Sequence, residues 1–195
     1  MVAAAELTAE NDRILDLGCG NGRLLLALPK KIIYQGVDFS STLLAEAKKL
    51  HPKANFLEAD ITNKDTWRDL PKFDAIFCVA VLHHLESDKQ RFLISYIRRR
   101  LKPAGFAYLS VWNLWQSQFL QNHLWSLPLK LHHWRYLEVP FMNQWQRFCV
   151  AFDKRYFERL LTTAGLKIKQ LEYLKKNGQP GSWLDGANLV ALVTR

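Results

Sequence analysis

Short apolar runs alternate with helix-like stretches over the first hundred residues of the chain. Runs of this kind, bounded by glycine, proline or polar clusters, are typical of buried strands, and helices are expected between them. The predicted strands are Arg13–Leu17, Ile32–Val37, Asn55–Glu58, Phe73–Val79 and Phe106–Val111. The predicted helices are Arg23–Leu28, Leu43–Leu50 (capped by the hydroxyls of Ser40–Thr42) and Ser87–Leu101, and a turn is expected at Lys102–Gly105.

Strands that alternate with helices predict βαβ crossovers, in which a parallel sheet is covered by helices on both faces. The C-terminal part adds an amphipathic helix over Asp153–Ala164, closed by Gly165. Two last strands are expected at Lys167–Leu174 and Asn188–Thr194, with a turn-rich segment over Lys175–Gly181 between them. The sequence therefore predicts an α/β fold with one seven-stranded, mostly parallel sheet.

The stretch from Trp112 to Val150 does not follow this alternation. It contains five of the seven tryptophans, together with His123, His132 and His133. Long loops inside compact domains are usually lids or binding elements, so we expect an insertion that covers the functional site. The adjacent pair His132-His133 lacks the i, i+4 spacing of a helical metal site, and no metal is expected.

The composition is that of a globular domain with an excess of positive charge. The chain has 195 residues, 49% hydrophobic and 23% charged, which favours a single domain over residues 1–195. Lys and Arg number 27 against 18 Asp and Glu, and the net charge of +9 favours an anionic partner such as nucleic acid or a membrane surface.

No apolar run approaches the roughly 18 residues that span a bilayer, and the first residues lack the basic start and apolar core of a secretory signal. The three cysteines are widely separated and lack C-x-x-C spacing, which indicates neither a disulfide scaffold nor a zinc site. A reducing, cytoplasmic location is therefore expected.

A glycine loop, Asp16-Leu-Gly-Cys-Gly-Asn-Gly22, follows the first predicted strand. Glycines let the backbone approach a ligand, and a helix that starts there presents N–H groups to an anion. The dinucleotide fingerprint G-x-G-x-x-G needs its third glycine at position 23, where this chain has Arg23. A purely structural turn is the other reading of this loop.

Two further acids, Asp38 and Asp60, follow the next two predicted strands. A single aspartate after a strand is often no more than a helix cap. Ligands of open α/β sheets bind at the carboxyl ends of the strands, however, so we expect both acids and Asp16 to meet in one crevice.

Together these features resemble the class I S-adenosylmethionine-dependent methyltransferases over Arg13–Val111, about half of the chain. The acid two residues before the first glycine matches their first motif, and Phe73–His84 resembles their fourth. Lys102–Gly105 resembles their L-K-P-G-G turn, with Ala104 in place of one glycine.

The resemblance implies a Rossmann-like fold, S-adenosylmethionine as cofactor and methyl transfer as the reaction. It assigns the ribose hydroxyls to Asp38, the adenine amino group to Asp60, and the cofactor's amino group to backbone carbonyls around Cys78–Ala80. The implied cofactor-binding residues are Asp16, Gly18, Cys19, Gly20, Asn21, Gly22, Arg23, Asp38, Phe39, Asp60, Ile61, Cys78, Val79 and Ala80.

Within this class the details resemble the tRNA wobble-uridine carboxymethyl methyltransferases. Ala80–His84 matches their A-V-I-H-H, and Val111-Trp112 matches a strand that ends in V-W. Arg147–Phe152 stands where they have R-F/Y-Y-H-L-F, with Cys149-Val150 in place of Tyr-His. The resemblance implies an ester made on the carboxymethyl group of the wobble uridine of tRNA, with Arg147 holding that carboxylate or a phosphate.

Methyl transfer is an in-line displacement, for which the protein orients the acceptor and excludes water. His83 directly follows the fourth strand, so we expect it beside the methyl group as a base or a hydrogen-bond donor. Trp112 and Asn113 leave the fifth strand on the same side and are expected to line the acceptor pocket. The structural alternative is that Trp112 belongs to the core and that His83 orients a loop.

Three functional readings stay open at this point. The first is a methyltransferase that modifies tRNA, and the second is a methyltransferase that acts on a small metabolite or lipid. The third is a non-catalytic subunit that activates a partner, although the intact glycine loop and acids argue against it. The segment before the first strand is shorter than in the tRNA family, so a small accessory protein is expected to complete the lid.

Overall fold

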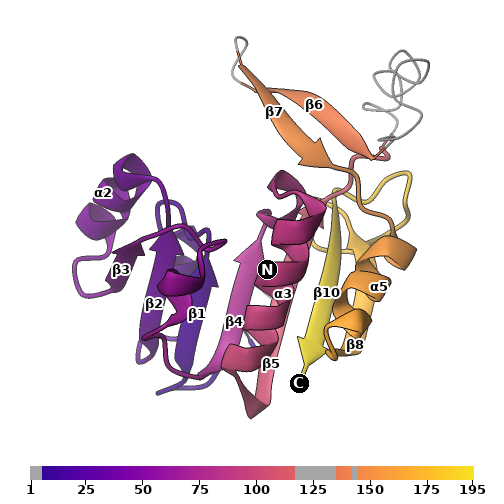
Figure 1. Cartoon of the computed structure of the whole chain (residues 1–195). Coiled ribbons are helices and arrows are strands. Elements are labelled where there is room, and N and C mark those ends of the chain that lie inside the picture. The colour runs from indigo at the N-terminus through magenta and orange to yellow at the C-terminus, as the bar shows by residue number, and fades with distance from the viewer. Residues whose placement is uncertain (1–5, 117–134, 142–144) are drawn as a thin grey trace.

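The computed structural model describes residues 6–116, 135–141 and 145–195 (Figure 1). The elements of the first half are β1 (Arg13–Leu17), η1 (Arg23–Ala27), β2 (Ile33–Asp38), α2 (Ser41–Leu50), β3 (Asn55–Glu58), η2 (Lys64–Trp67), β4 (Phe73–Val79), η3 (Leu82–His84) and α3 (Ser87–Arg100). Those of the second half are β5 (Leu101–Trp112), β6 (Tyr136–Phe141), β7 (Trp145–Val150), α5 (Lys154–Thr163), β8 (Lys167–Leu174), β9 (Pro180–Gly181) and β10 (Asn188–Thr194).

The main sheet confirms the predicted α/β fold. Its strand order is β3-β2-β1-β4-β5-β10-β8-β9, and the first five strands along the chain are all parallel. β10 runs antiparallel to both β5 and β8. The count is eight rather than seven because the two-residue β9 pairs with β8 inside the segment expected to be only a turn.

β5 begins earlier than the sequence predicted. The expected turn at Lys102–Gly105 is instead the first part of this strand, and its register with β4 shifts between Phe73 and Ala75. A Cβ atom at Gly105 would lie 2.8 Å from the carbonyl oxygen of Asp74. Glycine is therefore required here by the close approach of two backbones, which the motif-based expectation of a turn did not anticipate.

Side chains alternate between two buried layers, one on each face of the sheet. On β1, Leu15 and Leu17 belong to the same cluster as Leu93 of α3 and Leu161 of α5. Ile14 points the other way, into a second cluster. Figure 1 shows α3 and α5 lying along one face of the sheet. Among the described residues, the second layer includes Leu24 of η1.

The first predicted helix is only a short 3-10 helix. It was expected over Arg23–Leu28 and ends at Ala27, with Leu28 in extended conformation (φ −92°, ψ 156°). Leu28 precedes Pro29, and the residue before a proline is pushed out of the helical region. The stretch that remains is too short to support an α-helix.

The run Arg98–Arg100 at the end of α3 holds neighbouring segments together. Arg98 Nε donates to the carbonyl oxygen of Gly165 over 3.1 Å, and Arg100 donates to the carbonyl oxygen of Trp67. Arg99 lies over the ring of Tyr96, 5.2 Å from its centroid. These arginines therefore act in packing and in capping backbone carbonyls, at the opposite end of α3 from η3.

The predicted insertion contains the antiparallel hairpin β6–β7, which projects beyond the carboxyl ends of β4 and β5 (Figure 1). Its base is packed, because Leu114, Cys149 and Ala151 form a small buried cluster and Trp115 Nε1 donates to the carbonyl oxygen of Phe152 over 2.9 Å. His123, Trp125, His132, His133 and Trp134 lie outside the described residues. No described helix has the length and apolar character needed to cross a membrane.

Candidate functional site

The three acids singled out in the sequence stand at the carboxyl ends of three neighbouring strands. Asp16 lies within β1, Asp38 is the last residue of β2, and Asp60 follows β3. These strands are adjacent and parallel, so their ends lie at one edge of the sheet. Asp16 and Asp38 are buried whereas Asp60 is exposed. The sequence therefore placed the acids correctly along one edge.

Asp38 organises the backbone at this edge. Its two oxygens accept hydrogen bonds from the N–H groups of Gly20 (2.8 Å) and Ser40 (2.9 Å). Each carboxylate oxygen has two lone pairs, so capacity remains for further donors. Phe39 beside it is 81% exposed, which presents an aromatic face next to the carboxylate. Asp60 uses Oδ1 for a local turn, accepting from the backbone N–H and hydroxyl of Thr62.

The glycine loop adopts a backbone that other residues rarely take. Gly18, Gly20 and Gly22 have φ values of 69°, 54° and 79°. A Cβ on Gly18 would stand 2.3 Å from a methyl carbon of Val81. The N–H groups of Gly18 and Cys19 both donate to the carbonyl oxygen of Val37, so the loop is fixed onto the end of β2. Because η1 is so short, the loop does not lead into the α-helix that the sequence predicted.

Of the remaining predicted cofactor residues, some belong to the loop itself and the others stand at the ends of β3 and β4. Cys19 and Ile61 are buried, Asn21 is half-buried and Arg23 is exposed. The side chain of Cys78 is part of the core, so only its backbone faces the edge. Ala80 has the unusual φ of 58°, and its N–H donates to Ser110. Val79 is half-buried at the end of β4, and a backbone role around residues 78–80 is compatible with this geometry.

Tyr34 is a residue at this edge that the sequence analysis missed. Its hydroxyl donates to Asp16 Oδ2 over 2.8 Å. Burial raises the pKa of Asp16 to about 7, the hydrogen bond from Tyr34 opposes this rise, and the charge of Asp38 adds to it. The sequence gives no signal for this contact, because Tyr34 lies on β2 and Asp16 on β1, and only the register of the two strands brings them together.

The side of the edge at which the sequence predicted the acceptor is built by η3, β5 and β7. His83 is fully buried, and its Nδ1 accepts from the backbone N–H of Trp112 over 3.4 Å. The rings of His83 and Trp112 lie 4.6 Å apart, and those of His83 and His84 lie 4.1 Å apart. Gln90 fixes η3 from below by donating to the carbonyl oxygens of Leu82 and Leu85.

Arg147 lies on β7, which packs against η3, and its charge acts on both histidines. Burial lowers the pKa of His83 well below its usual value, and the charges of His84 and Arg147 lower it further. The pKa of His84 is lowered by burial and by Arg147 in the same way. His83 is therefore a neutral imidazole near pH 7, and a cation lies close to it.

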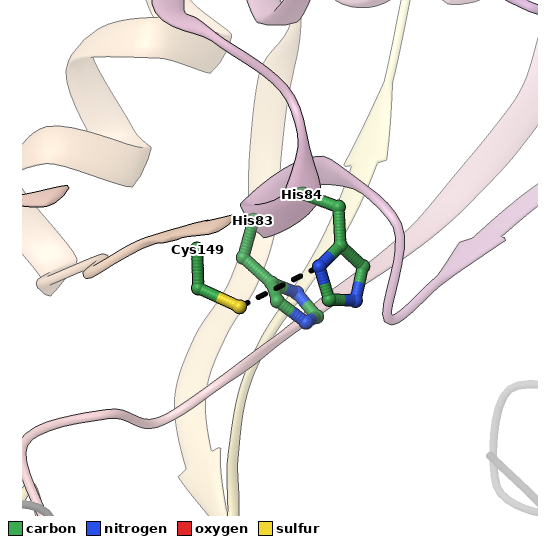
Figure 2. A group of neighbouring side chains, drawn as sticks. All are labelled: His83, His84 and Cys149. Atoms are coloured by element: carbon green, nitrogen blue, oxygen red, sulfur yellow. Dashed lines mark hydrogen bonds between the residues drawn. The ribbon is translucent and has the colours of Figure 1, made fainter. Parts of the chain in front are cut away.

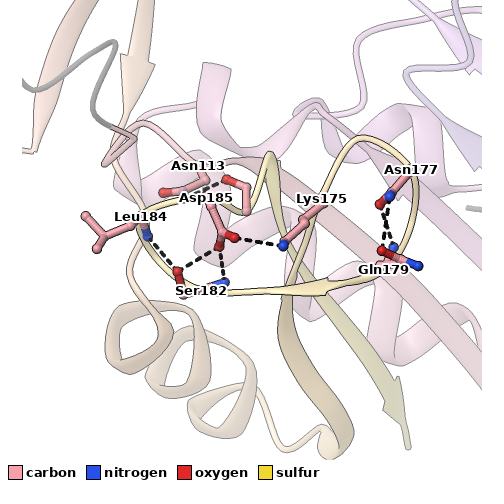
Figure 3. Close-up of polar contacts among 8 residues, drawn as sticks. Asn113, Lys175, Asn177, Gln179, Ser182, Leu184 and Asp185 are labelled. Atoms are coloured by element: carbon pink, nitrogen blue, oxygen red, sulfur yellow. Dashed lines mark hydrogen bonds and ion pairs between the residues drawn. The ribbon is translucent and has the colours of Figure 1, made fainter.

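Asn113 does not line a pocket as expected. Its side chain is fully buried and donates to the carbonyl oxygens of Trp183 (2.9 Å) and Gly186 (2.8 Å), so it holds the loop before β10 (Figure 3). In the same loop Asp185 pairs with Lys175 and accepts from Ser182. The sequence could not indicate this role, because the partners lie about seventy residues further along the chain.

The known proteins that this chain resembles in sequence are methyltransferases. A family model described as a methyltransferase domain matches residues 14–105. A ubiquinone biosynthesis O-methyltransferase of Coxiella burnetii is 34% identical over 115 residues, which cover 55% of this chain and 47% of the relative. A tRNA (carboxymethyluridine(34)-5-O)-methyltransferase of Arabidopsis thaliana is 32% identical over 133 residues, 68% of this chain and 30% of the relative. The chain thus spans about half or less of the length of these curated relatives.

Solved structures share the whole fold. A methyltransferase from Methanosarcina mazei superposes with a TM-score of 0.78 at 20% identity and covers 99% of this chain and 96% of its own. A Haloferax volcanii methyltransferase, solved in complex with the Trm112 methyltransferase activator, gives 0.70 at 17% identity, covering 98% and 86%. At these identities the likeness establishes the fold.

Proposed function

We propose that this chain, which belongs to the class I S-adenosylmethionine-dependent methyltransferases, methylates a carboxylate oxygen on tRNA, that of a carboxymethyl group on the wobble uridine. The observation that carries the proposal is that β7, which bears Arg147, packs against η3, which bears His83. A carboxylate is already a nucleophile, so the protein needs a cation to hold it rather than a strong base. The net charge of +9 also favours a polyanion such as tRNA.

S-adenosylmethionine is the cofactor, and it supplies a methyl carbon activated by a positive sulfonium. We assign its ribose hydroxyls to Asp38 and its adenine to the exposed ring of Phe39, with Asp60 and Ile61 nearby. Asp16, the loop Gly18–Arg23 and the backbone at Cys78–Ala80 would enclose the methionine part. The positive φ angles of the loop and the lone pairs left on Asp38 fit this assignment.

His83, Trp112 and Arg147 are assigned to the acceptor. Because the N–H of Trp112 faces Nδ1 of His83, the neutral ring carries its proton on Nε2. Nε2 is buried and has no hydrogen-bond partner among the described residues. A buried donor of this kind fits an acceptor oxygen, since leaving it unpaired costs about 1–3 kcal/mol. The ring of Trp112 offers a face on which a base or the sulfonium can rest.

A phenol or lipid hydroxyl is the second candidate acceptor. It is favoured by the apolar cluster of Leu114, Cys149 and Ala151 against Trp112 and Trp115, and by the similarity to the Coxiella relative. In that case His83 would take the hydroxyl proton on Nε2, which requires the other tautomer, with the ring's own proton on Nδ1 and the contact from the N–H of Trp112 given up. The tRNA relative matches a larger share of this chain, and the charge of Arg147 suits an anionic acceptor, so we favour tRNA.

Mass spectrometry of nucleosides distinguishes the two acceptors. The chain is incubated with undermodified tRNA and isotopically labelled methyl donor, and the digested nucleosides are analysed. Label in a wobble-uridine ester supports the proposal. Label absent from tRNA but present on a quinol precursor in a parallel reaction would establish the second candidate instead. Because a Haloferax methyltransferase of the same fold was solved with an activator, both reactions are run with and without a Trm112-type partner.

Arg147→Ala should lower kcat/KM for the anionic acceptor by about 10- to 100-fold, because a charge-assisted contact to the carboxylate is lost. The dissociation constant for S-adenosylmethionine should remain within about twofold of wild type. Arg91→Ala, an exposed arginine of α3 paired with Asp88, is the matched control and should change neither quantity. Equal turnover by Arg147→Ala and Arg91→Ala would remove Arg147 from the acceptor site.

Cofactor affinity should depend on pH through Asp16. Below its pKa of about 7 the carboxyl is protonated, and the proton must leave before the negative charge can attract the positive cofactor. The affinity is therefore expected to fall about eightfold between pH 7.5 and pH 6, as measured by calorimetry. Tyr34→Phe removes a hydrogen bond that lowers this pKa, so the fall should begin at higher pH, whereas Tyr96→Phe on α3 should behave like wild type. A flat profile for the wild type would contradict the role of Asp16.

A further inference from the structure

We propose that His83, His84 and Cys149 form a binding site for one Zn²⁺ ion at the acceptor end of the sheet. Each of these residues offers one ligand atom, and the three atoms lie within 4.8 Å of one another (Figure 2). Two ligands come from η3, and the third comes from β7, 65 residues further along the chain. The group therefore forms only when the hairpin β6–β7 folds against η3.

The spacing of the ligand atoms fits a tetrahedral zinc centre. Cys149 Sγ and His84 Nδ1 are 3.5 Å apart. With Zn–S of about 2.3 Å and Zn–N of about 2.0–2.1 Å, a tetrahedral angle places two such ligands about 3.6 Å from each other. Two imidazoles and one thiolate are also ligands of the borderline-soft kind that zinc prefers over magnesium or calcium.

His83 has hydrogen-bonding capacity that no described group uses. His83 is fully buried, and its Nε2 has no hydrogen-bond partner among the described residues. Its only described partner at Nδ1, the N–H of Trp112, lies 3.4 Å away, near the long limit of a hydrogen bond. A metal ion at Nε2 would require the ring to carry its proton on Nδ1, and the ring would then give up only the long contact from the N–H of Trp112.

The charges near the group make Cys149 essential. Arg147 stands two residues before Cys149 on β7 and adds a positive charge to this strand, so a divalent cation there needs an anionic ligand. The thiolate of Cys149 brings the compensating negative charge, and its proton is released when the ion binds. No other thiol or carboxylate belongs to the group among the described residues.

Three protein ligands leave the fourth coordination position for water or for an oxygen of the substrate, as in catalytic zinc sites. An ion on Nε2 of His83 would replace the donor role that the proposed function gives this nitrogen, and the acceptor oxygen would then bind at the open position; this part rests on the proposed function. The binding of the ion does not, because it requires neither S-adenosylmethionine nor an acceptor.

The site is tested on the whole chain without cofactor or acceptor, with Co²⁺ as a coloured substitute for Zn²⁺. Wild type should bind one equivalent, show the thiolate-to-cobalt band in the near ultraviolet, and lose it when Zn²⁺ is added. Cys149→Ser should weaken binding by at least about 100-fold and abolish the band. His84→Asn, at a half-buried position, should also weaken binding, whereas His51→Asn, outside the site, should not.

Circular dichroism confirms that each variant is folded before binding is compared. Absence of binding to wild type, or a Cys149→Ser protein that binds as tightly, would overturn the site and leave a simple S–H···N hydrogen bond. Methyl transfer is assayed separately with and without a chelator. A chain that methylates its acceptor yet binds no cobalt refutes only the metal site, and a chain that binds cobalt yet methylates nothing refutes only the proposed function.

Discussion

Asp38→Ala is expected to reduce the affinity for S-adenosylmethionine by at least about 100-fold, or about 2.7 kcal/mol. Two causes act together. The variant loses the carboxylate assigned to both ribose hydroxyls, and it releases the N–H of Gly20, which Asp38 now holds at 2.8 Å. The fold should persist, because α2 keeps its own cap at Ser40, whose side chain accepts from Leu43.

Isothermal calorimetry measures this loss, with thermal unfolding as the check on the fold. Asp88→Asn is the matched control, because Asp88 is an exposed acid at the start of α3 and its partner is Arg91. It should bind the cofactor like wild type. An Asp38→Ala protein with undiminished affinity would show that the cofactor lies elsewhere.

Gly18→Ala is expected to cost about 2–4 kcal/mol of stability and to abolish measurable cofactor binding. The strain of a left-handed backbone contributes about 1–2 kcal/mol. The remainder comes from the new Cβ, which would stand 2.3 Å from Val81 and force the loop or η3 to move.

Two companion variants separate these causes in denaturant unfolding. Gly178→Ala has a similar φ of 84° but no atom within 4 Å of the new Cβ, so it should show the backbone cost alone. Gly18→Ala combined with Val81→Ala removes the clash and should recover part of the lost stability. If Gly18→Ala and Gly178→Ala unfold at the same denaturant concentration, the close contact between Gly18 and Val81 does not contribute to the loss of stability.

The strands could be predicted from the sequence wherever an apolar run is bounded by glycine, proline or polar residues. The predicted bounds of β1, β3, β4, β8 and β10 match the structure, because each run ends at a polar or glycine-rich segment. The helix expected over Asp153–Ala164 is α5, although Asp153 is its N-cap, accepting from the N–H of Tyr156, rather than its first residue. The leucines after Arg23 favour a helix, but the sequence analysis did not predict that it would be only the short 3-10 helix η1. Pro29 pushes Leu28 into extended conformation and so ends the helix early.

The site was predictable to the extent that it depends on strand ends. Asp16, Asp38 and Asp60 follow consecutive parallel strands, so the topology alone places them along one edge. Contacts across long sequence separations gave no signal. The register of β1 and β2 brings Tyr34 to Asp16, and the hairpin β6–β7 brings Cys149 to His84. Asn113 was expected to line the acceptor pocket, but its side chain holds the loop at Trp183.

A crystal structure with S-adenosylhomocysteine, the product left after methyl transfer, would show whether the carboxyl ends of β1, β2 and β3 enclose one nucleoside. We expect both ribose hydroxyls within hydrogen-bond distance of Asp38, with the adenine between Phe39 and Ile61. A ligand found away from this edge, or one whose ribose makes no contact with Asp38, would contradict this assignment.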